Sequence, residues 1–306
     1  MRKSARNARR AHDAAKAVSS ERPVLVKLGG ELLEDAGYVA ALASKLARLA
    51  RKLPFIIVHG GGREIDSALA KAGIEKRQID GVRVTDEATL EVVVAVLAGL
   101  VNTRFVGALS ATGLGAVGLT GADAGIGLVE QASRHMSSTG VTVDLGRVGE
   151  PIGRRRPTLL VDLCKHGYVP VIASIGVARD GRLFNVNADT LAAHLASRLR
   201  SPRLVIAGAT AGVLDRQGAT IPDLFYEDLG ALVRGGAATA GMIAKLAACR
   251  QALHNGVREV FITDGRDLEG LVGLVGEGLR WGGCTQITKV KLPARRRKRV
   301  TAVKAS

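Results

Sequence analysis

The chain has 306 residues, of which 47% are hydrophobic and only 3% aromatic, and its formal net charge is +16. That length accommodates one large α/β domain or two modest ones with proper cores. The longest apolar run, residues 92–101, is about half of the roughly 20 residues that a membrane-spanning helix needs, so no membrane segment is expected. Cys164, Cys249 and Cys284 form no paired motif, which argues against disulfides or a zinc site and favours the reducing cytoplasm, with each thiol buried.

The positive charge lies mainly at the two ends of the chain. Residues 1–20 carry six Lys/Arg and one acid, and residues 287–306 carry eight Lys/Arg and no acid, which leaves only about +3 for the body. Basic tails attract polyanions without specificity, and the scarcity of aromatic residues argues against a platform for single strands, so nucleic-acid binding is not expected. The first 20 residues resemble an Arg-rich transit peptide, but alanines spaced by three and four favour a short helix.

The first two expected strands both end in glycines. Val24–Leu28 leads into Gly29-Gly30, and Phe55–His59 leads into Gly60-Gly61-Gly62. Leucines at helical spacing between these strands predict a helix. Further helices are expected at residues 64–72, 87–109, 159–166, 188–198 and 239–254.

The remaining expected strands alternate with these helices. They are residues 115–119, an irregular segment at 141–148, residues 169–174, 204–207 and, as the last strand, 260–263. Asp180-Gly181 between short alternating runs predicts a hairpin over residues 177–185. The alternation predicts an α/β fold, a three-layer sandwich around a mostly parallel sheet.

Two tempting motifs lack the context that they require, and a third is absent. The glycines of residues 113–118 match a dinucleotide fingerprint, but they precede a strand instead of joining a strand to a helix. His59-Gly60-Gly61-Gly62 looks like an esterase oxyanion loop, yet the chain has no G-x-S-x-G elbow. A G-x-x-x-x-G-K-[ST] loop is also absent, so any nucleotide must be held in another way.

The glycine clusters at the ends of the first two strands lie where open α/β sheets bind ligands. Glycine lets backbone N–H groups approach an anion, and Lys27 adds a positive charge beside the first pair. Taken alone, the same residues could be two tight turns and a surface lysine.

Eight short motifs, taken in order, resemble the amino acid kinase family. They are Lys27-Leu28-Gly29-Gly30, Val58-His59-Gly60-Gly61-Gly62, Gly81-Val82-Arg83-Val84-Thr85-Asp86, Gly118-Leu119-Thr120-Gly121, Leu145-Gly146-Arg147-Val148-Gly149, residues 170–176, Asn185-Val186-Asn187-Ala188-Asp189 and Gly241-Met242-Ile243-Ala244-Lys245. The resemblance covers residues 23–287 and implies a carbamate-kinase-like fold. Within the family, the motifs are most similar to those of kinases that act on N-acetylglutamate in arginine biosynthesis.

The resemblance implies a reaction and assigns residues to it. The γ-phosphoryl group of ATP, with Mg²⁺ held mainly by the phosphates and no metal site of the protein's own, would pass to a side-chain carboxylate and give an acyl phosphate. Lys27 and Lys245 match the catalytic lysines, and Asp189 matches the aspartate that holds them. Read without the resemblance, Lys245 is a solvated helix residue and Asp189 a helix N-terminal acid.

The glycines and the acceptor residues are assigned in the same way. Gly29, Gly30, Gly60 and Gly61 would donate N–H groups to the phosphoryl oxygens, and the last two also to the acceptor. Arg83 matches the residue that binds the α-carboxylate of the acceptor, although it could be a surface ion-pair partner, and Asn185 would bind the same end. The nucleotide would lie against Gly208, Ala209, Gly212, Gly241 and Met242.

Three departures from the family pattern concern the nucleotide side and regulation. Gly208 and Ala209 stand where the family has a hydroxyl residue and an aspartate, which puts ATP affinity in question. Ala240 and Ala244 replace a glycine and a proline near Lys245. Residues 264–287 lack the histidine and the Gly-x-Gly-Thr segment of arginine-inhibited members, so feedback by arginine stays open.

The expected organisation has four parts: an N-terminal extension (1–22), an acceptor-binding and dimerisation domain (23–200), a nucleotide domain (201–287) and a basic disordered tail (288–306). The expected assembly is a homodimer or a hexamer built from three dimers. Besides a kinase for free N-acetylglutamate, two hypotheses remain. One is a kinase for amino-adipate or glutamate on an acidic carrier protein, which the basic tails would suit. The other is a non-catalytic regulatory or binding subunit.

Overall fold

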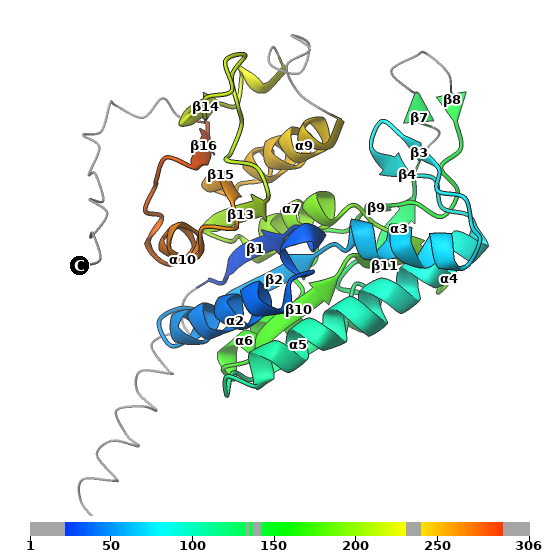
Figure 1. Ribbon diagram of the computed structural model, residues 1–306, viewed down its shortest axis with the longest axis horizontal. Helices are drawn as coiled ribbons and strands as arrows, with labels where there is room; N and C mark the ends of the chain where they lie inside the picture. The colour runs from blue at the N-terminus through cyan, green and yellow to red at the C-terminus, as the bar shows by residue number, and fades with distance from the viewer. Residues whose placement is uncertain (1–21, 133–134, 137–141, 231–239, 290–306) are drawn as a thin grey trace, which may run out of the picture.

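Eight strands form one sheet in the computed structural model, which describes residues 22–132, 135–136, 142–230 and 240–289 (Figure 1). Their order is β14 (Asp223–Phe225), β16 (Cys284–Thr288), β15 (Glu259–Asp264), β13 (Arg203–Gly208), β1 (Val24–Leu28), β2 (Phe55–His59), β10 (Val169–Ala173) and β5 (Ala116–Thr120). Neighbouring strands run parallel except β15 and β16. The mostly parallel sheet of the predicted α/β fold is therefore confirmed, and β1 lies near its middle.

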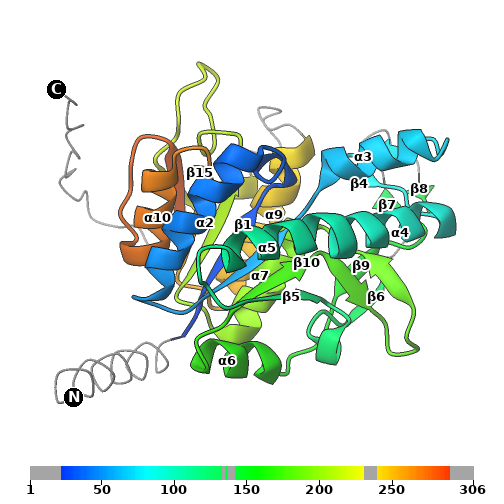
Figure 2. The ribbon, with the colours of Figure 1, turned by 60° about the horizontal axis from the view of Figure 1, so that its bottom comes forward.

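Helices cover both faces of the sheet (Figures 1 and 2). The first face carries α2 (Ala36–Ala50), α3 (Gly62–Lys71), α10 (Leu268–Glu277) and one long helix made of α4 (Glu87–Val94), η2 (Ala95–Val101) and α5 (Asn102–Ser110); the second carries α6 (Thr158–Lys165), α7 (Ala188–Leu199) and α9 (Ala240–His254). Alternate residues of β1 serve the two faces, with Val26 and Leu28 in one hydrophobic cluster and Leu25 in the other. Such double burial explains why the strand is apolar except for Lys27.

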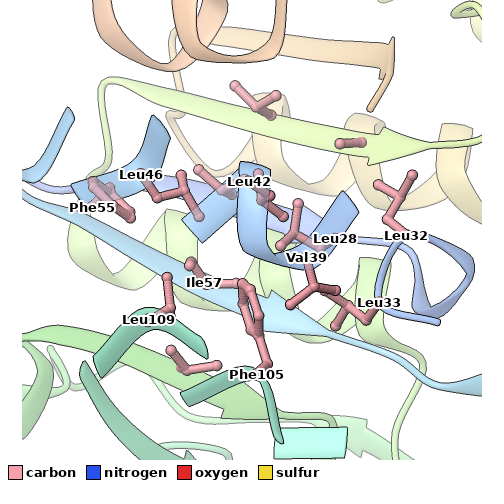
Figure 3. Close-up of a cluster of buried hydrophobic side chains, with 14 of the residues drawn as sticks. Leu28, Leu32, Leu33, Val39, Leu42, Leu46, Phe55, Ile57, Phe105 and Leu109 are labelled. Atoms are coloured by element: carbon pink, nitrogen blue, oxygen red, sulfur yellow. The ribbon is translucent and has the colours of Figure 1, made fainter. Parts of the chain in front are cut away.

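The first hydrophobic cluster joins β2 to the helices that cover this face of the sheet. Figure 3 shows Ile57 of β2 close to Leu42 of α2 and Phe105 of α5. All three side chains are fully or almost fully buried. This packing holds β2 against α2 and α5, and so helps to position the carboxyl ends of β1 and β2.

The long helix Glu87–Ser110 has 24 residues and by length and composition alone could cross a membrane. In the fold, the buried side chains Val93, Leu97 and Phe105 belong to the first hydrophobic cluster, so it is a core helix. Asp86 begins it, because the carboxylate accepts a hydrogen bond from the N–H of Thr89 at 2.8 Å. Its middle, η2, is a π-helix in which the turns are wider.

The hairpin predicted around Asp180-Gly181 is confirmed as β11 (Ile175–Val177) paired with β12 (Leu183–Asn185). Residues 260–263 form a strand as predicted, within β15, but the prediction that this strand is the last is wrong, because β16 follows α10. Three of the five residues of β16 are polar although all five are buried, and α10 contains three glycines, so neither element has a clear sequence signal.

The predicted N-terminal helix and most of the basic tail lie outside the described residues. The tail was expected to begin at residue 288, but Thr288 belongs to β16 and Lys289 donates to the carbonyl of His254 at 3.4 Å. Both are therefore part of the fold. All three cysteines are free and buried, as predicted.

Candidate functional site

Two lysines meet one aspartate beyond the carboxyl ends of the central strands. Lys27 Nζ lies 2.9 Å from Asp189 Oδ1, and Lys245 Nζ lies 3.9 Å from Asp189 Oδ2. The shorter contact is an ion pair without hydrogen-bond alignment at Oδ1. Lys27 and Asp189 are buried, while the Lys245 side chain is 21% exposed. The cluster carries a net charge of +1, which suits an anion.

The elements that hold these side chains are well defined by the sequence. Lys27 is the fourth residue of β1, between buried apolar neighbours. Asn187 caps α7 by accepting hydrogen bonds from the N–H groups of Asp189 at 2.9 Å and Thr190 at 3.1 Å. Asp189 thus lies in the first turn of α7, where the helix dipole stabilises its negative charge. Lys245 extends from α9, which packs against α7.

The two glycine turns touch each other beside this cluster. A Cβ atom on Gly30 would lie 2.5 Å from Gly61 Cα, so no side chain fits between the turns. Gly60 lies next to Ala188, whose Cβ is 3.7 Å from the position that a Gly60 Cβ would take. Since Ala188 precedes Asp189, the second turn and the charged cluster are neighbours.

The four glycines differ in what their N–H groups can do. The Gly29 N–H donates to the Ala207 carbonyl at 2.8 Å, so the expectation that it is available to an anion is corrected. The Gly60 N–H makes a longer bond to Leu28 at 3.3 Å. Within the described part of the chain, the N–H groups of Gly30 and Gly61 have no protein acceptor. Both stand at the start of helical turns, where free N–H groups attract anions.

Arg83 is buried beside the second glycine turn with part of its guanidinium unused. Its Nη2 donates to Asp66 and, at 3.4 Å, to the Gly62 carbonyl. Nη1 is buried and has no partner among the described residues. Burial alone would raise the pKa of Asp66, but hydrogen bonds from Lys76 and Arg83 outweigh it and hold that pKa below its ordinary value. An unpaired buried guanidinium nitrogen is costly, which fits a group that awaits a carboxylate.

Asn185 is linked to the backbone of Arg83 by two hydrogen bonds through Thr85. Its Nδ2 donates to Thr85 Oγ1 at 3.1 Å, and that hydroxyl donates to the Arg83 carbonyl at 3.0 Å. Thr85 is fully buried, so this chain of hydrogen bonds ties β12 to the segment of Arg83.

The residues expected to bind nucleotide lie at the end of β13 and the start of α9. A Cβ on Gly208 would lie 3.1 Å from Glu31 Oε1 and 4.0 Å from Lys245 Cε. Ala209 donates its N–H to Glu31 Oε1 at 3.1 Å. The sequence reasoning had not singled out Glu31, although it directly follows Gly29-Gly30.

The other three nucleotide-side residues have different surroundings. Gly212 has φ +75°, and a Cβ there would lie 2.5 Å from Thr285 Oγ1, so its glycine is required by packing against β16. Gly241 is open, with nothing near its absent Cβ, and Met242 is partly buried against the second hydrophobic cluster. In the parts of the chain that the structure describes, no group of three or more His, Cys, Asp and Glu could hold a metal ion.

Comparisons with known proteins agree with this architecture. Residues 22–264 match the model of the amino acid kinase family. The chain is 40% identical over 251 residues to the acetylglutamate kinase of Methylobacterium nodulans, covering 80% of this chain and 82% of the relative. It is 41% identical over 252 residues to the acetylglutamate kinase of Methanopyrus kandleri, covering 81% and 96%.

Solved structures with lower identity share the fold. An N-acetylglutamate synthase from Neisseria gonorrhoeae superimposes with a TM-score of 0.72 at 22% identity, covering 92% of this chain and 63% of that one. The Giardia carbamate kinase does so with a TM-score of 0.60 at 17% identity, covering 89% and 100%. From the extent of the family match and the identity to these relatives, it follows that the chain belongs to the amino acid kinase family.

Proposed function

We propose that this chain transfers the γ-phosphoryl group of ATP to the side-chain carboxylate of N-acetyl-L-glutamate, giving an acyl phosphate. The observation that carries the proposal is the Lys27–Asp189–Lys245 cluster beside the two touching glycine turns. Relatives about 40% identical are named acetylglutamate kinases, which supports this acceptor over others.

Phosphoryl transfer between two anions depends on positioning and charge neutralisation, because the protein supplies little covalent chemistry. In the proposed mechanism Lys27 and Lys245 bind oxygens of the transferred group from opposite sides. Asp189 holds both ammonium groups in place and, by keeping the net charge of the cluster at +1, prevents their mutual repulsion. The free N–H groups of Gly30 and Gly61 would donate to oxygens on which charge accumulates in the transition state.

The acceptor would lie between the glycine turns and Arg83. The buried Nη1 of Arg83 would pair with the α-carboxylate of the substrate, completing a fork whose other nitrogen is already held by Asp66. Asn185 would contact the same end. A buried guanidinium nitrogen that gains a partner only when the substrate binds discriminates strongly against acceptors that lack the carboxylate.

The nucleotide would approach from Gly208, Ala209 and the start of α9. Mg²⁺ does not need a site made only of protein ligands, because it binds through one or two carboxylates together with the phosphates of the nucleotide. Glu31, beside the Ala209 N–H, could supply one such oxygen. The metal would neutralise phosphate charge.

The test is a coupled ATP-turnover assay with free N-acetylglutamate, and then with a carrier-bound amino-adipate or glutamate acceptor. We expect turnover with free N-acetylglutamate, and glutamate without the acetyl group serves as the specificity control. Turnover only with a carrier-bound acceptor would show that free N-acetylglutamate is not the substrate and that the carrier-bound compound is. A folded protein with no turnover on either acceptor would refute the kinase proposal and favour a binding subunit.

A further inference from the structure

A buried chain of hydrogen bonds runs from the long helix to the second glycine turn. His59, the last residue of β2, is fully buried. Its Nδ1 lies 3.0 Å from the carbonyl oxygen of Gly60, and its Nε2 lies 3.0 Å from Asn102 Nδ2. Asn102 Nδ2 also lies 2.9 Å from the carbonyl oxygen of Val171 in β10.

These contacts determine where the protons lie. The Val171 carbonyl can only accept, so the Asn102 atom that faces it is the amide nitrogen. That nitrogen has a second hydrogen, which it donates to His59 Nε2, so Nε2 must carry the lone pair. The ring proton is then on Nδ1 and is donated to the Gly60 oxygen. Burial lowers the pKa of His59 to about 4, although the bond to Gly60 opposes this, so the ring stays neutral near pH 7.

The orientation of the Gly60 carbonyl sets the direction of the next N–H group. The described chain has no cis peptide bond, and in a trans peptide the C=O and N–H bonds point in opposite directions. Because the Gly60 oxygen faces the His59 ring, the Gly61 N–H points away from it. The Gly61 N–H has no acceptor in the described part of the chain, and the first glycine turn packs against the same peptide, since a Cβ on Gly30 would be 2.7 Å from the Gly61 nitrogen.

Two further features hold the Asn102 side chain in place. It is the first residue of α5, immediately after the wide turns of η2. A Cβ on Gly118 of β5 would collide with Asn102 Oδ1, so glycine at that position makes room for the amide. The amide therefore occupies a fixed slot between α5 and the sheet.

We propose that His59, held by Asn102, is a positioning residue that fixes the Gly60–Gly61 peptide so that the Gly61 N–H faces the transferred phosphoryl group. The proposal rests on the phosphoryl transfer proposed above, and His59 does not touch the substrate. It assigns a role in the reaction to a histidine that packing alone would explain as a buried core residue.

Two variants separate the roles of the ring nitrogens. In His59→Asn the amide nitrogen lies near the position of Nδ1 and can still donate to Gly60; in His59→Gln it lies near Nε2 and cannot. We expect His59→Gln to lower kcat roughly 10- to 100-fold with little change in KM for ATP. If the Gly61 N–H points in the wrong direction, its hydrogen bond to the transferred group is weakened, and that bond matters most in the transition state. We expect His59→Asn to retain most of kcat. Both variants lose the imidazole packing, so their losses of Tm should be similar.

A purely structural His59 would behave differently. If kcat falls equally in both variants, or follows the loss of Tm, the positioning role is overturned. The ¹⁵N shifts of the wild-type histidines, with the His59 signal identified by its absence in His59→Asn, test the proton assignment without any turnover. We expect the Nδ1–H form, and an Nε2–H form would overturn the proposal. Absence of wild-type turnover would refute the proposed function, while this measurement would still decide the hydrogen-bond chain.

Discussion

The two sides of the candidate site differ in how closely their atoms are packed. At the ends of β1 and β2, Gly30 and Gly61 meet backbone against backbone, and polar side chains beside them are held by hydrogen bonds, His59 to the buried Asn102 and Arg83 to Asp66. At the end of β13 and the start of α9, Gly208 is bordered by the flexible ends of Glu31 and Lys245, and Gly241 is open. The proposed phosphoryl and acceptor side is therefore fixed by the main chain, and the proposed nucleotide side by side chains that can move. We therefore expect the nucleotide side to tolerate substitutions better than the glycine turns do.

The largest effect is expected from the two lysines, which join the two sides. We expect Lys27→Ala or Lys245→Ala to lower kcat by at least about 100-fold, because each ammonium is proposed to neutralise transition-state charge. Steady-state kinetics with near-UV circular dichroism would measure this. The control is Lys165→Ala, which removes an exposed lysine on α6 that pairs with Asp162. Near-normal kcat in either site variant would end the catalytic assignment.

A pair of glycine variants compares the two sides directly. In Gly30→Ala the new Cβ would press on the Gly61 backbone and separate the turns, so we expect kcat to fall roughly 100-fold and Tm to fall. In Gly241→Ala the new Cβ meets no protein atom, and alanine favours the helix by about 1 kcal/mol, so kcat should be retained and Tm slightly raised, with any change confined to KM for ATP. Equal losses in both variants would contradict the comparison.

Arg83→Lys tests whether the buried guanidinium belongs to the acceptor. Lysine keeps the charge but loses the fork that binds a carboxylate through two nitrogens. We expect KM for the acceptor to rise about 10-fold or more while KM for ATP changes little. Arg63→Lys, at an exposed arginine that pairs with Glu34, is the control. Parallel changes in both KM values would show that Arg83 is structural.

The smallest effect concerns pH and stability. Burial lowers the pKa of His59 to about 4, and burial together with Arg198 lowers that of His194 to about 4. Between pH 6.5 and 4 the unfolded state binds protons that the folded state does not, so the free energy of unfolding should fall as pH falls. We expect each histidine to contribute a loss on the order of 2 kcal/mol by pH 5. Urea unfolding at pH 7 and pH 5 should show a smaller loss in His59→Asn than in wild type, and an equal loss would contradict the assignment.

Local sequence signals predicted most of the fold. β1 and β2 were predicted to the residue, because short buried apolar runs ending in glycine have few alternatives. α10 and β16 were missed, because Gly270, Gly273 and Gly276 weaken the helical signal and polar residues fill a strand that tertiary packing buries.

The candidate site was predictable only as far as the family motifs reach. They led to Lys27, Asp189 and Lys245, which the fold brings together. The partners of those motifs were not predictable: Asp66 and Asn102 have no local pattern, since each meets its partner only through the tertiary structure. The occupied N–H of Gly29 likewise follows from the pairing of β1 with β13, which the sequence does not encode locally.

The central place of β1 has a consequence for how the protein is made. Leu25 pairs with Ile56 on one side, but on the other with Leu204, about 180 residues later. At roughly 5–20 residues per second, a ribosome needs about 10–35 s to synthesise that stretch. During this time one edge of an apolar strand has no partner, and unpaired edges promote aggregation. We expect β1 to need cover by chaperones or by its own helices until β13 emerges, and Asp189 acquires its second lysine partner, Lys245, later still.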